Sequence, residues 1–186
     1  SINGTGSIFP AGTITVAEGS DQSFTITPNA GSTIVDVLVD GVSVGAVSTY
    51  TFTQVSQNHT ISADFDYITY TISASAGTGG SISPTGSVSV NDGGSQAYTI
   101  TPSAGYQVAD VLVDGIAVGP VSTYTFDQVS QNHSIHATFI VDTVTIASSA
   151  GTNGTISPAG SVNVLIGGSQ TFAITPDSGY VVSDVW

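Results

Sequence analysis

The sequence predicts an all-β protein, built from tandem small antiparallel β-sandwich or barrel-like modules of about 74 residues that form an elongated rod. Three observations point to this class. The 186 residues contain no Lys, Arg or Met, three Leu and one Glu, so good helix formers are scarce, whereas Val, Ile, Thr, Tyr and Phe are abundant. Apolar residues alternate with polar ones in short runs that end at Gly, Pro, Asn or Asp. The whole pattern also repeats along the chain.

The repeat has a period of 74 residues. Pro10, Pro84 and Pro158 follow one another at this spacing, and the segment VSTYTF occurs at 47–52 and again at 121–126. The chain therefore holds about two and a half copies of one repeat.

We expect three modules, formed by residues 1–66, 67–141 and 142–186. The first lacks its opening strand, the second is complete, and the third is incomplete at its C-terminal end. Two explanations are open. The chain is a fragment of a longer array, or a neighbouring chain supplies the missing strands, because an incomplete sheet exposes an unpaired edge that can recruit strands.

The complete second repeat predicts seven or eight short strands with turns between them. Pro84 and Pro102 each stop a strand, and residues 91–94 (NDGG) form a turn cluster. Such spacing is typical of a sandwich or a small barrel. The alternating positions place the strands at 70–74, 81–83, 88–90, 98–100, 111–113, 116–118, 124–126 and 135–139.

A two-residue hairpin turn is predicted at Asp114 and Gly115. Gly accepts a positive φ and Asp tolerates one, as a type I′ turn requires. The turn would pair Val113 with Ile116, and residue 111 with residue 118. We expect all four of these side chains to face the core.

The junctions between repeats, at 65–68 and 140–143, contain no Gly and no Pro. The last strand of one repeat therefore runs almost directly into the first strand of the next, which predicts a stiff string of modules. At a strand rise of about 3.3 Å per residue, each module spans roughly 30–35 Å and the chain on the order of 80 Å.

The charge balance excludes several classes of function. With no Lys or Arg and a formal net charge of −13, the chain cannot neutralise phosphates, so we expect no nucleic-acid partner. No apolar run is long enough to cross a bilayer, so we expect no membrane insertion. The absence of Cys excludes disulfides and cysteine-bound metals.

Two consecutive segments carry a family resemblance: GGSQAYTITPSAGYQV at 93–108 and ADVLVDGIAVGPVSTYTFDQVSQNHSIHATF at 109–139. Their Gly-Ser-Gln entry, Ile-Thr-Pro stop, VDG hairpin and Asn-His-x-Ile strand resemble the divergent InlB-type B-repeat, and the resemblance extends over the whole chain. It implies a secreted or cell-surface protein whose tandem repeats serve as spacers or adhesin segments, and it implies no enzyme.

Glycosylation is the first candidate modification. The pattern Asn-x-Ser/Thr, which accepts N-linked sugars in secreted proteins, occurs at Asn3, Asn58, Asn132 and Asn153. Asn58 and Asn132 are equivalent in the repeat. In a chain so rich in Ser and Thr such patterns also arise by chance.

Tyr106 and Tyr180 are candidates for stacking on sugars, because they stand at equivalent places after a glycine. The alternative is that both pack against their own loops. The first repeat has Ser32 at this position.

The acidic residues and histidines predict no catalytic, cofactor or metal site. The sequence has no calcium-binding loop motif, and repeated Asp36, Asp110 and Asp184 are interpreted as strand-edge residues that discourage pairing. His133 and His136 are three apart, which places them on opposite faces of a strand.

These observations favour a non-enzymatic extracellular structural repeat, a stalk or filament segment, whose expected partners are neighbouring repeats or other copies reached by strand pairing. The alternative is a glycan- or surface-binding adhesin module. An accessory array attached to a hydrolase is a third possibility.

Overall fold

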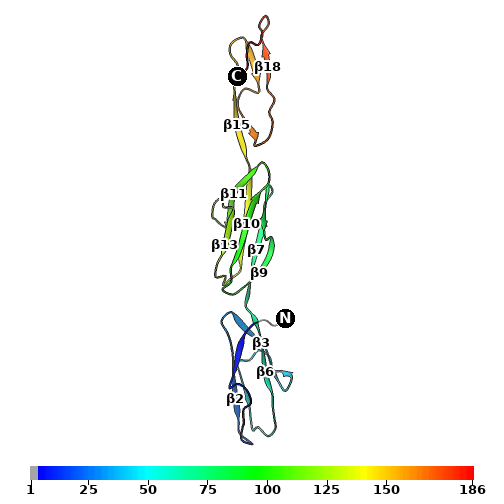
Figure 1. Cartoon of the computed structure of the whole chain (residues 1–186), viewed down its shortest axis with the longest axis vertical. Helices are drawn as coiled ribbons and strands as arrows, with labels where there is room; N and C mark the ends of the chain where they lie inside the picture. The colour runs from blue at the N-terminus through cyan, green and yellow to red at the C-terminus, as the bar shows by residue number, and fades with distance from the viewer. Residues whose placement is uncertain (1–3) are drawn as a thin grey trace. The chain divides into compact units, whose positions relative to one another are not determined.

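A computed structural model describes residues 4–186, and these residues form strands and turns with no helix among them (Figure 1). The predicted all-β class with tandem repeats is therefore confirmed. Within the same residues, no helix has the length and hydropathy to span a bilayer.

The second repeat contains eight strands in two sheets. One sheet has the order β12-β11-β14-β7-β9, and the other has the order β13-β10-β8. Alternate residues point inward and form the core, with Ile72, Val111 and Ala137 fully buried. The strands are β7 (Thr69–Ala76), β8 (Gly80–Ser83), β9 (Gly86–Asn91), β10 (Gln96–Pro102), β11 (Tyr106–Val113), β12 (Ile116–Ala117), β13 (Thr123–Phe126) and β14 (His133–Val141).

The first repeat has two three-stranded sheets, ordered β1-β2-β5 and β4-β3-β6. Its core consists of two groups, Phe24 with Val39 and Phe52, and a second group of Ile26, Val37 and Phe65. The strands are β1 (Gly6–Phe9), β2 (Gln22–Pro28), β3 (Ser32–Val39), β4 (Val42–Ser43), β5 (Thr49–Phe52) and β6 (Ile61–Tyr67).

The third repeat contains two strand pairs, β15-β17 and β16-β18. Its strands are β15 (Thr143–Ser148), β16 (Gly154–Ser157), β17 (Gly160–Leu165) and β18 (Ala173–Pro176).

Contacts divide the chain into two compact units. The first comprises Ser1–Ile72, Ser87–Ala97 and Thr125–His133, and the second comprises Ser73–Gly86, Tyr98–Tyr124 and Ser134–Trp186. The first unit therefore contains the first repeat, and the second contains the third repeat.

The predicted hairpin turn is present, but the predicted direction of its side chains is wrong. Asp114 and Gly115 both have positive φ, at 51° and 80°, and Val113 pairs with Ile116. Val111 is fully buried, whereas Ile116 is 70% exposed and Val118 38% exposed. The physical reason is that β12 is a two-residue strand at the outer edge of the five-stranded sheet, where β11 is its only neighbour in the sheet and both of its residues are exposed.

Asp36 and Asp110 do not have the expected role of strand-edge residues. Each lies at a bulge in a strand that is paired on both sides. The Oδ1 atom of Asp36 accepts hydrogen bonds from the amide of Gly45 at 3.1 Å and from the hydroxyl of Ser43 at 2.7 Å. In the second repeat, Oδ1 of Asp110 accepts a hydrogen bond from the amide of Gly119 at 2.9 Å. These carboxylates therefore stabilise the bulge and the return of the hairpin.

A second carboxylate ties the hairpin turn to the start of the last strand. Asp40 accepts a hydrogen bond from the amide of Thr60 at 2.8 Å, and its Oδ2 lies 2.7 Å from Nδ1 of His59. The His59 ring stacks on Phe52 with 4.8 Å between ring centroids. The hydrogen bond to His59, followed by that from Thr60, holds the pKa of Asp40 below its usual value.

The same tie recurs in the second repeat, where Asp114 accepts a hydrogen bond from the amide of Ser134 at 2.7 Å. The rings of Phe126 and His133 are again 4.8 Å apart. The recurrence indicates that the tie belongs to the fold of the repeat.

Two equivalent glycines allow a phenylalanine ring to lie against the backbone of a strand. A Cβ atom added at Gly80 would come within 2.3 Å of the Phe139 ring, and one added at Gly6 within 2.3 Å of the Phe65 ring. A Cβ atom added at Gly151, in contrast, would have no neighbouring atom within 4 Å. A side chain is therefore excluded at Gly6 and Gly80 by packing.

We predict that Gly80→Ala lowers the free energy of unfolding by about 1–3 kcal/mol, because the Phe139 ring must move away from β8. Urea denaturation followed by circular dichroism measures the change. Gly151→Ala is the matched control and should leave the midpoint near that of the unsubstituted protein. Equal midpoints for the two variants would contradict the packing argument.

Asp40→Asn should lower the unfolding midpoint at neutral pH, because it removes the charged acceptor for His59 and Thr60. The folded-state pKa of Asp40 lies below its unfolded value, so the stabilisation is present above about pH 4 and is lost as the pH falls through the lowered pKa. The difference in unfolding midpoint between the unsubstituted chain and Asp40→Asn should therefore disappear in acid. Asp177→Asn, which changes an exposed carboxylate, is the control. A difference in midpoint that persists unchanged below pH 3 would argue against a stabilising role of the charged Asp40 carboxylate.

Candidate functional site

The first repeat contains an open groove where the second repeat has a strand. Among residues 4–67, its sheet β4-β3-β6 has no equivalents of the strands β7 and β9 of the sheet β12-β11-β14-β7-β9. Residues 12–17 are equivalent to β9 but form no strand. A groove of about 850 Å³ lies between this segment and residues 55–61.

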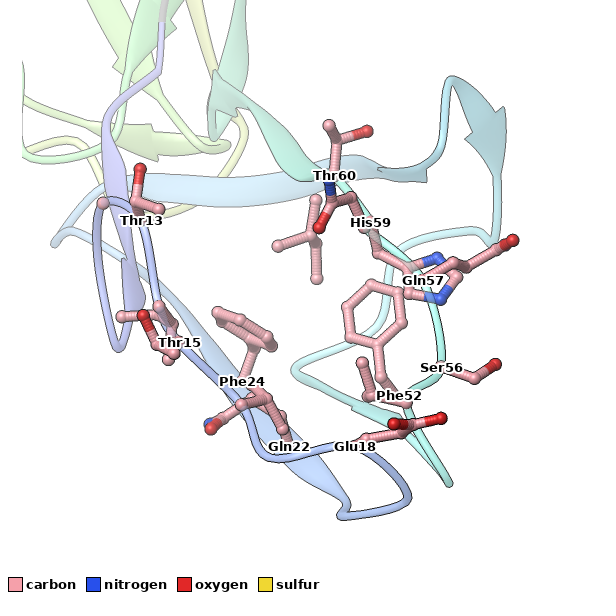
Figure 2. Close-up of a pocket in the computed structure, with 16 residues that line it drawn as sticks. Thr13, Thr15, Glu18, Gln22, Phe24, Phe52, Ser56, Gln57, His59 and Thr60 are labelled. Carbon is pink, nitrogen blue, oxygen red and sulfur yellow. The ribbon is translucent and has the colours of Figure 1, made fainter.

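The groove has polar walls and an aromatic floor. In Figure 2, Thr13 and Thr15 lie on one wall and His59 lies across from them, with Phe24 and Phe52 between. The rings of Phe24 and Phe52 meet edge to face with centroids 5.9 Å apart. The site therefore offers apolar surface bordered by hydroxyl and amide groups.

Side chains around the groove are more exposed than their equivalents in the second repeat. Val129, Ile135 and Ala137 are at most 1% exposed, whereas the equivalent Val55, Ile61 and Ala63 are only half-buried. In the second repeat, this surface is covered by β7, whose Ile72 is fully buried and whose Ala74 is 4% exposed. The groove is thus the space that a strand equivalent to β7 would fill.

A second cavity, of about 650 Å³, lies in the third repeat. It is bordered by β15, β16 and β18 and by the last residues of the chain. Trp186, the one tryptophan, is fully exposed beside it.

The structure gives local roles to some of the predicted glycosylation sites. Asn3 lies outside the described residues. Asn58 is exposed and lines the groove, and Asn153 is exposed with a positive φ of 70°. The Oδ1 atom of Asn132 accepts a hydrogen bond from the amide of Thr71 in β7 at 2.8 Å. Sugar attachment at these residues stays a prediction.

Tyr106 packs on the backbone of its own repeat. A Cβ atom at Gly79 would lie 2.3 Å from the Tyr106 ring, and 37% of Tyr106 remains exposed. Tyr180 is 53% exposed. Ser32, the equivalent residue in the first repeat, is buried and its hydroxyl accepts a hydrogen bond from the amide of Thr5 at 3.1 Å. Loop packing thus accounts for Tyr106, and sugar stacking stays a prediction.

Within residues 4–186, no group of three or more His, Asp or Glu side chains is placed to hold a metal ion. His136 contacts the hydroxyl of Ser75 at 2.8 Å, whereas His133 lies beside Phe126, so the two histidines serve separate contacts. Burial raises the pKa of the Tyr98 hydroxyl.

Each junction between repeats is closed by two backbone hydrogen bonds that the sequence did not reveal. The amide of Ile68 donates to the carbonyl of Gly31 at 2.9 Å, and its carbonyl accepts from the amide of Asp92 at 2.8 Å. Ile68 is the single residue between β6 and β7. Both of its backbone groups are therefore held by turns of the two repeats that it joins.

The second junction repeats this arrangement. The amide of Asp142 donates to the carbonyl of Gly105 at 2.8 Å, and its carbonyl accepts from the amide of Ile166 at 3.1 Å. The residue types differ between the junctions because only main-chain groups take part. The sole sequence signal is the period of 74 that relates Gly31 to Gly105.

Comparison with known proteins identifies the repeat. No curated protein and no solved structure matches the chain. The family model of the divergent InlB B-repeat domain matches residues 2–69 and 70–143. InlB-type B-repeats are associated with bacterial cell-surface proteins and are not a known enzyme family. The chain therefore belongs to the divergent InlB B-repeat family.

Proposed function

We propose that this chain is a non-enzymatic extracellular structural repeat that serves as a stalk or filament segment. The observation that carries the proposal is the closed junction, where Ile68 and Asp142 each use both backbone groups to bind turns on either side. Such a linker keeps few free dihedral angles, unlike the Gly- and Ser-rich linkers that allow modules to move independently.

The energetic effect of the junction follows from its hydrogen bonds. Each backbone bond contributes a net of about 0.5–1.5 kcal/mol, so a pair restrains the linker residue by about 1–3 kcal/mol. Because the same pair of hydrogen bonds recurs at each junction, every linker of an array would be restrained in the same way. A spacer that holds a distal part away from a surface needs such stiffness.

The composition supports an exposed location. The surface is rich in hydroxyl groups, and the absence of Lys and Arg leaves no site for trypsin-like proteases. Self-repulsion at a net charge of −13 favours solubility.

The adhesin alternative has less support. It needs exposed aromatic residues in every repeat, but Tyr106 packs on Gly79 and the first repeat has a buried Ser32.

Ile68→Pro tests the closed junction, because proline has no amide hydrogen to donate to Gly31. The chain has no native cysteine, so spin labels can be placed at Val42→Cys and Ile116→Cys, both on exposed hairpins. We expect a narrow distribution of label-to-label distances in the otherwise unchanged chain and a broad one with Ile68→Pro.

Ile68→Ala is the matched control, since it removes the side chain and keeps both backbone groups. Its distance distribution should stay narrow. A broad distribution without any junction substitution would refute the stalk proposal.

A further inference from the structure

We propose that the free edge of β9, in the second repeat, is a self-association site, at which β9 of a second copy of this chain pairs with it in the antiparallel direction. The pairing would join the five-stranded sheets of the two copies into one continuous sheet. This inference goes beyond the stalk proposal, because it concerns contact between chains and does not depend on the stiffness of the junctions. It rests on the second repeat alone, whose eight strands are all described.

β9 is paired along one edge only. Among residues 4–186, β7 is its only neighbour in the sheet. Of the strands at the outer edges of the two sheets it is the longest, with six residues against four in β8, four in β13 and two in β12. Proteins commonly protect such an edge by shortening it or by placing Pro or a charged residue in it. The β9 sequence GSVSVN has no such protection.

The backbone groups of alternate residues of β9 point toward its free edge. β7 and β9 are equivalent to β15 and β17 of the third repeat, which pair antiparallel. The amide of Asp92 donates to the carbonyl of Ile68 at 2.8 Å, so these two residues form a hydrogen-bonded pair. Such pairs recur at every second residue of an antiparallel ladder, so the two valines of β9 bind β7. The amide and carbonyl groups of Ser87 and Ser89 therefore point away from β7.

The part of the repeat that contains β9 carries no charge. No acidic residue lies between Asp66 and Asp92, a range that includes β7, β8 and β9. The equivalents of β9 in the other repeats, residues 12–17 (GTITVA) and β17 (GSVNVL), are also uncharged. With a net charge of −13 and no Lys or Arg, two copies of the chain repel each other at their acidic surfaces. A neutral edge is therefore the favoured place for a second copy.

Charge also decides the direction of the pairing. With Ser89 opposite Ser89 of the second copy, Asp92 of each chain lies opposite Gly86 of the other. The two Asp92 residues are then separated by six residues along the strands, about 20 Å, which is beyond the screening length at ordinary salt concentration. In a parallel pair in register, the two Asp92 residues would lie about 5 Å apart. The antiparallel direction is therefore favoured.

The antiparallel arrangement is self-complementary. Ser89 would exchange two backbone hydrogen bonds with its own copy, and Ser87 would pair with Asn91, as a two-fold axis requires. All three side chains are already exposed, so none has to leave the core. A contact of one strand pair buries little surface and is weak by itself, but an array of repeats would multiply it.

The test is sedimentation velocity of the whole chain over a range of concentrations, where we expect concentration-dependent self-association. Ser89→Pro should weaken it at least about tenfold, because proline removes the outward amide from both copies and leaves the bonds to β7 in place. Ser89→Ala keeps this amide and is the matched control, which should associate like the unsubstituted chain.

Ser89→Cys tests the register, since the chain has no native cysteine. Opposed residues of a hydrogen-bonded pair have Cα atoms about 5.5 Å apart, within reach of a disulfide, so oxidation in air should give a covalent dimer. Thr71→Cys is the control, because Thr71 lies opposite Ser89 on β7, as Thr145 lies opposite Asn163 in the third repeat. Three strand spacings, about 14 Å, would separate its two copies, so it should form no such dimer.

Self-association that is lost in Ser89→Pro and kept in Ser89→Ala, with crosslinking of Ser89→Cys but not of Thr71→Cys, would support the site. A chain that stays monomeric, association unchanged in Ser89→Pro, or equal crosslinking of the two cysteine variants would overturn it and leave the distance measurements at the junction unaffected. If Ser89→Pro does not fold, the two cysteine variants decide alone. Association that Ser89→Pro abolishes, without crosslinking of Ser89→Cys, would overturn the antiparallel register.

Discussion

The fold of the repeat depends on one strand that is paired along both edges. In the second repeat, β7 lies between β14 and β9, and its Ile72 covers a core that is otherwise open. Where its equivalent is absent from the described residues, in the first repeat, the segment equivalent to β9 forms no strand and Val55, Ile61 and Ala63 become partly exposed. The eight residues of β7 thus provide both the backbone pairing of the sheet and the burial of the apolar core.

The alternation of apolar residues was sufficient to predict the class and the strands of the repeat. Ile72, Ile100 and Ile135 were expected on strands and are buried. The alternation was a reliable signal on these inner strands. It failed at Ile116, since alternation reports which face a residue shares with its neighbours but not whether its strand lies at the outer edge of the sheet.

The candidate site was predictable only in part. The alignment of the repeats predicted that the first repeat lacks its first strand, and this stays a prediction. The groove itself depends on the conformation of residues 12–17 and 55–61, which the alignment does not give. The junction bonds of Ile68 and the hairpin tie of Asp40 could not be found from residue types. The first uses only main-chain atoms, and the second joins residues about 20 apart through a turn whose geometry had to be known.

Contacts between β7 and β14 advance in the same direction along both strands, from Thr71 with Asn132 to Ser75 with His136, so the two strands run parallel. This parallel pairing has a mechanical consequence. The chain enters the second repeat through β7 and leaves it through β14. Tension applied at the two ends would pull these neighbouring strands in opposite directions along their length, loading all the bonds between them in shear. Bonds loaded together must break together, so the repeat should resist stretching better than one whose terminal strands peel apart one bond at a time.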